Sequence, residues 1–199
     1  MLDILLATNN LGKIKEIKDI LSSPKVKILT IKDFPKLPKV EEDGKTYQEN
    51  AFRKANKISK YTGKICLADD SGLEIDYLKG EPGIYSKRWG NRDEERICKV
   101  LKLLKNTPKN KRSAKFVCVA VLIFPDGKIN MVKEECMGSI TFKPKGECGF
   151  GYDPIFLVPG YNKTFAELGE KVKNQISHRG KAMRKMINII NELVINKRT

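Results

Sequence analysis

Two adjacent carboxylates, Asp69 and Asp70, follow an apolar run in the segment Leu67-Ala68-Asp69-Asp70-Ser71-Gly72, where we expect a strand to end. Burying such a pair without a cation would cost free energy. Because neighbouring side chains of a strand face opposite sides, at most one carboxylate should face a site, and the other should hydrogen-bond with its surroundings. Mg²⁺ prefers a few carboxylates together with phosphate oxygens, and Glu41 or Glu42 could add a ligand. A capped turn is the alternative interpretation.

A second candidate, the segment Ala7-Thr8-Asn9-Asn10-Leu11-Gly12-Lys13, lies between the first apolar run and a helical pattern. Small and polar residues at such a junction place backbone N–H groups, a hydroxyl, amides and an ammonium around one spot, which suits a phosphate. The spacing of the Walker P-loop is absent. A plain turn with a helix cap has the same composition, so both interpretations stay open.

A third candidate is the glycine-rich segment Gly146-Glu147-Cys148-Gly149-Phe150-Gly151-Tyr152-Asp153-Pro154. Glycines allow the backbone to approach a flat ligand, and Phe150 offers a stacking surface for a base. A hairpin loop with a core aromatic residue would account for the same pattern.

The fourth candidate, Lys173-Asn174-Gln175-Ile176-Ser177-His178-Arg179-Gly180, leads into the last helical pattern. If Ser177 is the N-cap, His178 and Arg179 lie in the first turn, where the helix dipole disfavours cations. We therefore expect an electron-rich partner at this helix start. His178 is the only histidine of the chain, and a structural role and a binding role both stay open.

Strand and helix patterns alternate along the chain and must position these four segments. Strands are expected at residues 2–7, 26–31, 65–68, 73–75, 116–124 and 155–158, and helices near residues 14–21, 46–62, 97–104 and 186–193. Pro125-Asp126-Gly127 divides two β-rich runs, which predicts a hairpin and hence a mixed sheet. We predict a single α/β domain over residues 1–199.

The net charge of +15 favours an acidic partner, either a nucleic-acid backbone or a small polyanion such as a triphosphate. The densest basic run, residues 105–112, lacks interleaved aromatic residues, which favours a solvated surface. Five scattered cysteines form no close pair, which indicates a reducing, cytoplasmic compartment. No run approaches the roughly 18 to 20 apolar residues of a membrane span, so no membrane association is expected.

The four segments occur in an order that resembles the inosine triphosphate pyrophosphatase family. The resemblance runs from Leu5 to about Ala182, and several motifs in sequence are far less expected by chance than one. Besides the segment from Ala7 to Lys13, the shared motifs are Thr46-Tyr47-Gln48-Glu49-Asn50-Ala51, Ala68-Asp69-Asp70-Ser71-Gly72-Leu73, Pro82-Gly83-Ile84-Tyr85-Ser86, Gly149-Phe150-Gly151-Tyr152-Asp153-Pro154 and Ile176-Ser177-His178-Arg179-Gly180.

The resemblance implies an elongated mixed α/β fold of two lobes around a central active-site cleft, usually in a homodimer. The implied reaction is Mg²⁺-dependent hydrolysis of ITP, dITP or XTP to the monophosphate and pyrophosphate, with no stable nucleic-acid complex. By analogy, Asp70 is the general base and binds the metal with Glu42, and Ser71 lies beside the substrate. The implied phosphate-binding residues are Thr8, Asn9, Asn10, Leu11, Gly12, Lys13 and Lys54, and the implied base-binding residues are Phe150, Gly151, Tyr152, Asp153, Lys173, His178 and Arg179.

Arg179 is the candidate discriminator, since hypoxanthine and xanthine present a keto oxygen where adenine has an amine, and arginine only donates. Asn9, where the family often has glycine, and Val172, where it commonly has glutamate, leave open the loop geometry and the orientation of Lys173. Two other functions stay open: a pyrophosphatase for other modified nucleotides, and a basic nucleic-acid-binding protein. The latter leaves Asp69 and Asp70 unexplained, because carboxylates repel phosphates unless a metal intervenes.

Overall fold

The computed structural model describes residues 1–34 and 36–196, and the chain divides into two compact units. Unit 1 comprises Met1–Asp70, Cys118–Glu134 and Arg179–Thr199, and unit 2 comprises Ser71–Val117 and Glu135–His178. Each unit is therefore built from segments that are far apart in the sequence. That the whole chain acts as one domain stays a prediction.

Among the described residues, a mixed seven-stranded sheet has the order β2-β1-β3-β4-β5-β6-β7. The strands are β1 (Leu2–Leu6), β2 (Val26–Thr30), β3 (Ile65–Ile75), β4 (Ser113–Ile123), β5 (Ile129–Ile140), β6 (Phe156–Val158) and β7 (Lys163–Thr164). β1 pairs in parallel with β2 and β3, whereas β6 pairs antiparallel with β5 and β7. The turn after β4 closes where Phe124 N–H donates to Lys128 O at 2.9 Å. The predicted α/β class, hairpin turn and mixed sheet are confirmed.

The helices of the described residues are α1 (Leu11–Ile20), α2 (Tyr47–Thr62), α3 (Asp93–Leu103), α4 (Phe165–Ile176) and α5 (His178–Asn196). At the beginning of α2, Thr46 accepts a hydrogen bond from Glu49 N–H at 3.1 Å, and at its end Gly63 adopts a left-handed φ of 64°. Both predicted ends of this helix are confirmed. Across residues 1–34 and 36–196, no helix combines the length and apolar character needed to cross a membrane.

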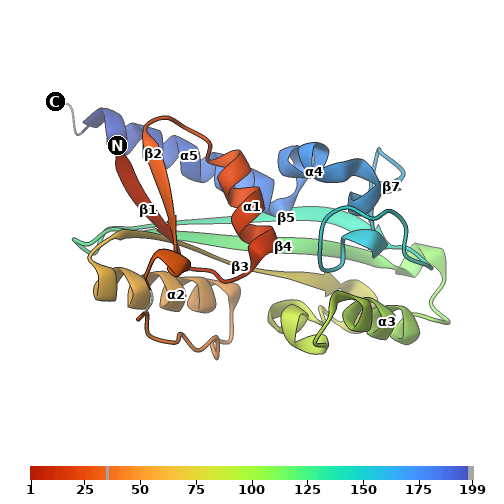
Figure 1. Cartoon of the computed structure of the whole chain (residues 1–199). Helices are drawn as coiled ribbons and strands as arrows, with labels where there is room; N and C mark the ends of the chain where they lie inside the picture. The colour runs from red at the N-terminus through yellow and green to blue at the C-terminus, as the bar shows by residue number, and fades with distance from the viewer. Residues whose placement is uncertain (35, 197–199) are drawn as a thin grey trace. The chain divides into compact units, whose positions relative to one another are not determined.

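In unit 1, α1 and α5 cover one face of the strands and α2 covers the other (Figure 1). Ile4 and Leu6 of β1 share a core cluster with side chains of α1 and α5, whereas Leu5 between them points to the opposite face and is also fully buried. A strand that is covered on both faces needs such a continuous apolar run. The helices on the two faces of β1 hold this strand in place. They thereby also position the short segment that joins the end of β1 to the beginning of α1.

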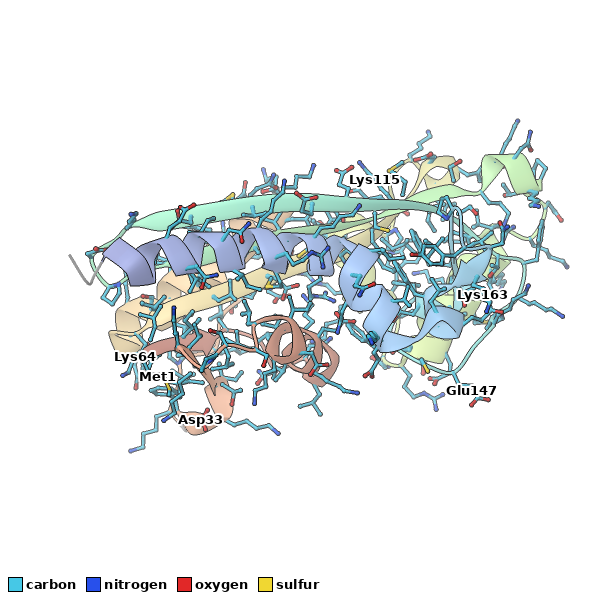
Figure 2. The ribbon with its side chains drawn as sticks, turned by 90° about the horizontal axis from the view of Figure 1, so that it is seen from above. Met1, Asp33, Lys64, Lys115, Glu147 and Lys163 are labelled. Atoms are coloured by element: carbon cyan, nitrogen blue, oxygen red, sulfur yellow. The ribbon has the colours of Figure 1, made fainter. Side chains whose placement is uncertain are left out.

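In unit 2, phenylalanine rings pack against one another in the core. The ring centroid of Phe156 lies 4.5 Å from that of Phe116 and 5.3 Å from that of Phe165. Ile97 and Val100 of α3 belong to the same cluster. Figure 2 shows Glu147, at the beginning of the glycine-rich loop, at the protein surface. The loop thus leads from the surface to the aromatic core.

β3 differs from the prediction. The sequence predicts one strand at residues 65–68 and another at residues 73–75, but a single strand runs from Ile65 to Ile75 and contains both carboxylates. The prediction was wrong because aspartate and glycine are depleted in strands. In the folded chain, each carboxylate is buried against its own polar partners, so the strand continues through both residues.

Candidate active site

The two adjacent carboxylates of β3 have different partners, which confirms the alternation predicted for a strand. Asp69 is fully buried, and its Oδ2 lies 2.9 Å from Lys13 Nζ and 3.2 Å from Arg179 Nε. Burial alone would raise the pKa of Asp69, but Lys13 and Arg179 hold that pKa well below its ordinary value of 3.8. Asp69 therefore remains ionised and anchors two cationic side chains.

Asp70 lies against polar side chains of α2. Its Oδ2 accepts a hydrogen bond from Asn50 Nδ2 at 3.1 Å, and its Oδ1 lies 3.4 Å from Lys54 Nζ. Burial outweighs the effect of these partners and raises the pKa of Asp70 above its ordinary value of 3.8. A carboxylate with a raised pKa accepts a proton more readily than an exposed aspartate, which suits a general base.

Asn50 and Lys54 lie one helical turn apart on the buried face of α2. Asn50 also accepts a hydrogen bond from Gly44 N–H at 2.9 Å, so it connects the acidic turn at residues 41–44 to Asp70. Sequence reasoning named Lys54 by analogy and quoted Asn50 only within a motif, with no site role. The available signal was its spacing of four residues from Lys54 on the same helix face.

Glu42 completes the surroundings of Lys54, whose Nζ lies 2.9 Å from Glu42 Oε1. One ammonium group therefore contacts the carboxylates of both Glu42 and Asp70. Although burial opposes it, Asp70 and Glu42 raise the pKa of Lys54 above 10.5. The described residues contain no group of three metal-ligating side chains. Two converging carboxylates nevertheless fit Mg²⁺, which commonly takes one or two protein carboxylates together with substrate phosphates and water.

The segment between β1 and α1 forms a polar turn at a helix N-terminus. Asn10 caps α1 by accepting a hydrogen bond from Lys13 N–H at 3.0 Å, and Thr8 Oγ1 accepts one from Asn10 N–H at 3.2 Å. Asn9 and Leu11 are exposed. The first N–H groups of α1, including that of Gly12, have no acceptor within the helix itself, which is the arrangement that binds anions at helix N-termini.

Arg179 is buried near the beginning of α5 and forms ion pairs with Asp69 and Glu16. These carboxylates are the electron-rich partners that the sequence requires at this helix start. Sequence reasoning missed Glu16, although an acidic residue between Ile14 and Ile17 on the core-facing side of α1 was a signal. The thiol of Cys118 lies 4.0 Å from Asp69 Oδ2 and borders the same buried network.

The glycine-rich loop of unit 2 is organised by an ion pair. Lys173 of α4 pairs with Asp153, and its Nζ also lies 4.4 Å from the ring centroid of Phe150. Asp153 Oδ2 accepts a hydrogen bond from Phe150 N–H at 2.8 Å. Gly149 is required here because a Cβ at this position would lie 2.2 Å from Asp153 Oδ2, and its φ is +82°. The loop thus presents Phe150 in a fixed backbone conformation.

The remaining predicted residues of unit 2 are mostly buried. Tyr152 OH donates to Ser86 O at 2.9 Å, and burial raises the pKa of this tyrosine above its ordinary value of 10. The ring of His178 stacks on Phe116, with centroids 4.7 Å apart and an angle of 11° between the planes. Ser71 is half-buried on β3. Ser86 was quoted only within a motif, and its hydroxyl has a structural role because it accepts a hydrogen bond from Leu73 N–H at 2.8 Å.

Each unit therefore assembles one part of the predicted set. Unit 1 brings together the two lysines predicted to bind phosphate, the two metal-ligand candidates and the candidate discriminator, namely Lys13, Lys54, Glu42, Asp70 and Arg179. Unit 2 brings together Phe150, Asp153 and Lys173. The first group suits phosphates and a divalent cation, and the second offers an aromatic ring beside a cation and a carboxylate.

Known proteins with similar sequences and structures cover nearly the whole chain. A protein from Desulforamulus reducens named dITP/XTP pyrophosphatase is 46% identical over 196 residues, which cover 97% of this chain and 98% of that protein. A protein of the same name from Clostridium perfringens is 46% identical over 196 residues, covering 94% and 96%. The solved structure of a HAM1 protein from Coxiella burnetii gives a TM-score of 0.87 at 40% identity, covering 96% of this chain and 100% of that one. The model of the Ham1 family matches residues 4–189, and this chain belongs to that family.

Proposed function

We propose that this protein hydrolyses ITP, dITP and XTP to the nucleoside monophosphate and pyrophosphate. The observation that carries the proposal is the position of Asp70, a buried carboxylate with a raised pKa that shares the Lys54 ammonium with Glu42. The names of relatives that are 46% identical over nearly their full length support the same reaction.

In the proposed reaction, a water oxygen forms a bond to the α-phosphorus while the bond from that phosphorus to the bridging oxygen of the β-phosphate breaks. Asp70 accepts the proton of the attacking water, and pyrophosphate leaves with the electron pair of the broken bond. Lys13 and Lys54 neutralise phosphate charge in unit 1. Mg²⁺, bound by Glu42 and Asp70, would supply further charge neutralisation at the phosphate oxygens.

Base recognition is assigned to the aromatic loop and to side chains that only donate hydrogen bonds. Phe150 would stack on the purine, with Gly151, Tyr152 and Asp153 shaping its surroundings and with His178 beside the base. Lys173 is assigned to base binding, and Arg179 is the candidate discriminator, because it has donors and no acceptor and so favours a keto oxygen over the amine of adenine.

A substrate panel tests the proposal. Purified protein with Mg²⁺ should release pyrophosphate from ITP, dITP and XTP much faster than from ATP or GTP, and a chelator should abolish the release. Equal rates on all five nucleotides would reject the specificity, and preference for a modified pyrimidine would favour a related pyrophosphatase. Salt-sensitive duplex binding that survives Asp70→Ala, without any hydrolysis, would instead favour a nucleic-acid-binding protein.

The proposal also includes a homodimer and a cytoplasmic location. The family resemblance supports the dimer, and sedimentation equilibrium of the full chain tests it: a mass of one chain, 22.6 kDa, would contradict it. The scattered free cysteines and the nucleotide substrate support the cytoplasm. Fractionation of cells that express the native chain tests the location.

A further inference from the structure

Two carboxylates fix the backbone on both sides of Phe150. Asp153 Oδ2 accepts a hydrogen bond from Phe150 N–H at 2.8 Å, and Asp93 Oδ2 accepts one from Gly151 N–H at 2.6 Å. These donors belong to the peptide groups immediately before and after the Phe150 side chain. Asp153 lies in the same loop, whereas Asp93 reaches it from the first turn of α3, 58 positions earlier in the sequence.

Asp93 is itself held in place. Arg96, one turn later on α3, pairs with Asp93 and also donates from Nε to Gly90 O at 2.9 Å. Arg96 thereby connects the carboxylate to the backbone just before the helix. A carboxylate that is already oriented loses little conformational entropy when it binds the Gly151 N–H.

The loop and α3 border a common cavity. Residues of α3, including Ile97 and Leu101, and of the loop, including Phe150, line a cavity of about 780 Å³. Gly151 has a φ of +64°, a conformation that glycine adopts readily and that leaves an unanchored loop flexible. The hydrogen bond from Gly151 to Asp93 therefore adds an anchor from α3 to the anchors that Asp153 and Lys173 provide.

We propose that Asp93 is a positioning residue for base recognition, because it fixes the Phe150 ring through the Gly151 N–H. This inference rests on the proposed function, in which Phe150 stacks on the purine. Aromatic stacking depends on ring geometry, so loosening the loop weakens binding of the base. The proton acceptor Asp70 and its partners in unit 1 are unaffected, so the loss falls on KM and leaves kcat in place.

Steady-state kinetics of Asp93→Ala with ITP test the inference. We expect KM to rise about tenfold with kcat changed less than about twofold, the size of a lost charge-assisted hydrogen bond. The inhibition constant of inorganic tripolyphosphate, which has no base, should not change. Hydrogen exchange should become faster in a peptide that spans residues 149–153. Asp93→Asn should restore most of the affinity, since its amide oxygen still accepts from Gly151 N–H.

Glu94→Ala is the matched control. Glu94 lies beside Asp93 in the first turn of α3, is exposed and lines the same cavity, so its removal takes the same charge from the helix N-terminus. KM should stay at the wild-type value in this variant. Equal KM values for Asp93→Ala and Glu94→Ala would overturn the inference, as would a loss confined to kcat.

If Asp93→Ala fails to fold, a second variant, Arg96→Gln, tests the same inference. Arg96→Gln removes the ion pair that orients Asp93, and it should raise KM by a smaller factor than Asp93→Ala does. An unchanged KM, together with unchanged hydrogen exchange of residues 149–153, would overturn the inference. Failure of the proposed function is distinguishable, because the wild-type protein would then hydrolyse none of ITP, dITP and XTP.

Discussion

The ammonium nitrogen of Lys54 lies 3.4 Å from Oδ1 of Asp70. The same nitrogen lies 2.9 Å from Oε1 of Glu42 and donates to the backbone oxygen of Asp69 at 2.8 Å. One cation thus compensates a carboxylate in the middle of a buried strand and a second one from an acidic turn. This arrangement helps to explain why β3 continues through Asp70, and in the proposed reaction it would orient this carboxylate as the proton acceptor.

Asp70→Asn should reduce pyrophosphate release from ITP by at least about 100-fold, on the scale of general-base catalysis. Asparagine can still accept the hydrogen bond from Asn50, but it cannot take a proton from water. The melting temperature should stay close to that of the wild-type protein, because the replacement has nearly the same volume. Initial rates and thermal unfolding measure the two quantities.

Asp76→Asn serves as the control for that variant. Asp76 follows the end of the same strand and is exposed, so its rate should equal that of the wild-type protein. Full activity of Asp70→Asn would show that another group accepts the proton.

Glu42 and Glu41 should differ in their effect on metal dependence. Glu42→Gln should raise the Mg²⁺ concentration for half-maximal rate by about tenfold or more, as changes around metal sites commonly do. Glu41 is exposed, so Glu41→Gln should leave the metal titration unchanged. Rates measured across a Mg²⁺ series for both variants test this, and equal curves would contradict the proposed role of Glu42 as a metal ligand.

Local signals in the sequence predicted much of the fold and only part of the candidate site. Thr46 and Gly63 mark the ends of α2 because capping chemistry depends on neighbouring residues. Local propensity predicts that a strand ends at the two aspartates of β3. The strand continues through them because partners from distant parts of the sequence compensate their charges. Asp93 was missed because it acts through a residue that is far away in the sequence, and although the position of Glu16 on α1 was a signal, its distant partner Arg179 was not predictable from spacing. Neither pattern nor spacing predicts where the chain divides into units.

Arg179→Ala should lower the free energy of unfolding by about 3–5 kcal/mol, because it leaves Asp69 and Glu16 buried without their shared partner. From the sequence alone, Arg179→Ala is expected mainly to reduce base selectivity. The buried ion pairs of the structure add the expected loss of stability. Urea unfolding at pH 7 measures it. Lys185→Ala is the control on the same helix, since Lys185 is exposed where it pairs with Glu134 and should contribute less than about 1 kcal/mol. Equal destabilisation by both variants would contradict the buried pairing.

The five cysteines should divide into two reactive and three protected thiols. Cys98 and Cys148 are exposed, whereas Cys66, Cys118 and Cys136 are buried. Burial raises the pKa of Cys66 to about 12, so almost none of this thiol is ionised at neutral pH, and the thiolate is the reactive form. Titration of the native protein with an aromatic disulfide reagent should modify two thiols quickly, and all five should react in denaturant. Cys98→Ser should leave one fast thiol; rapid reaction of a third in the native protein would contradict the packing of unit 1 or unit 2.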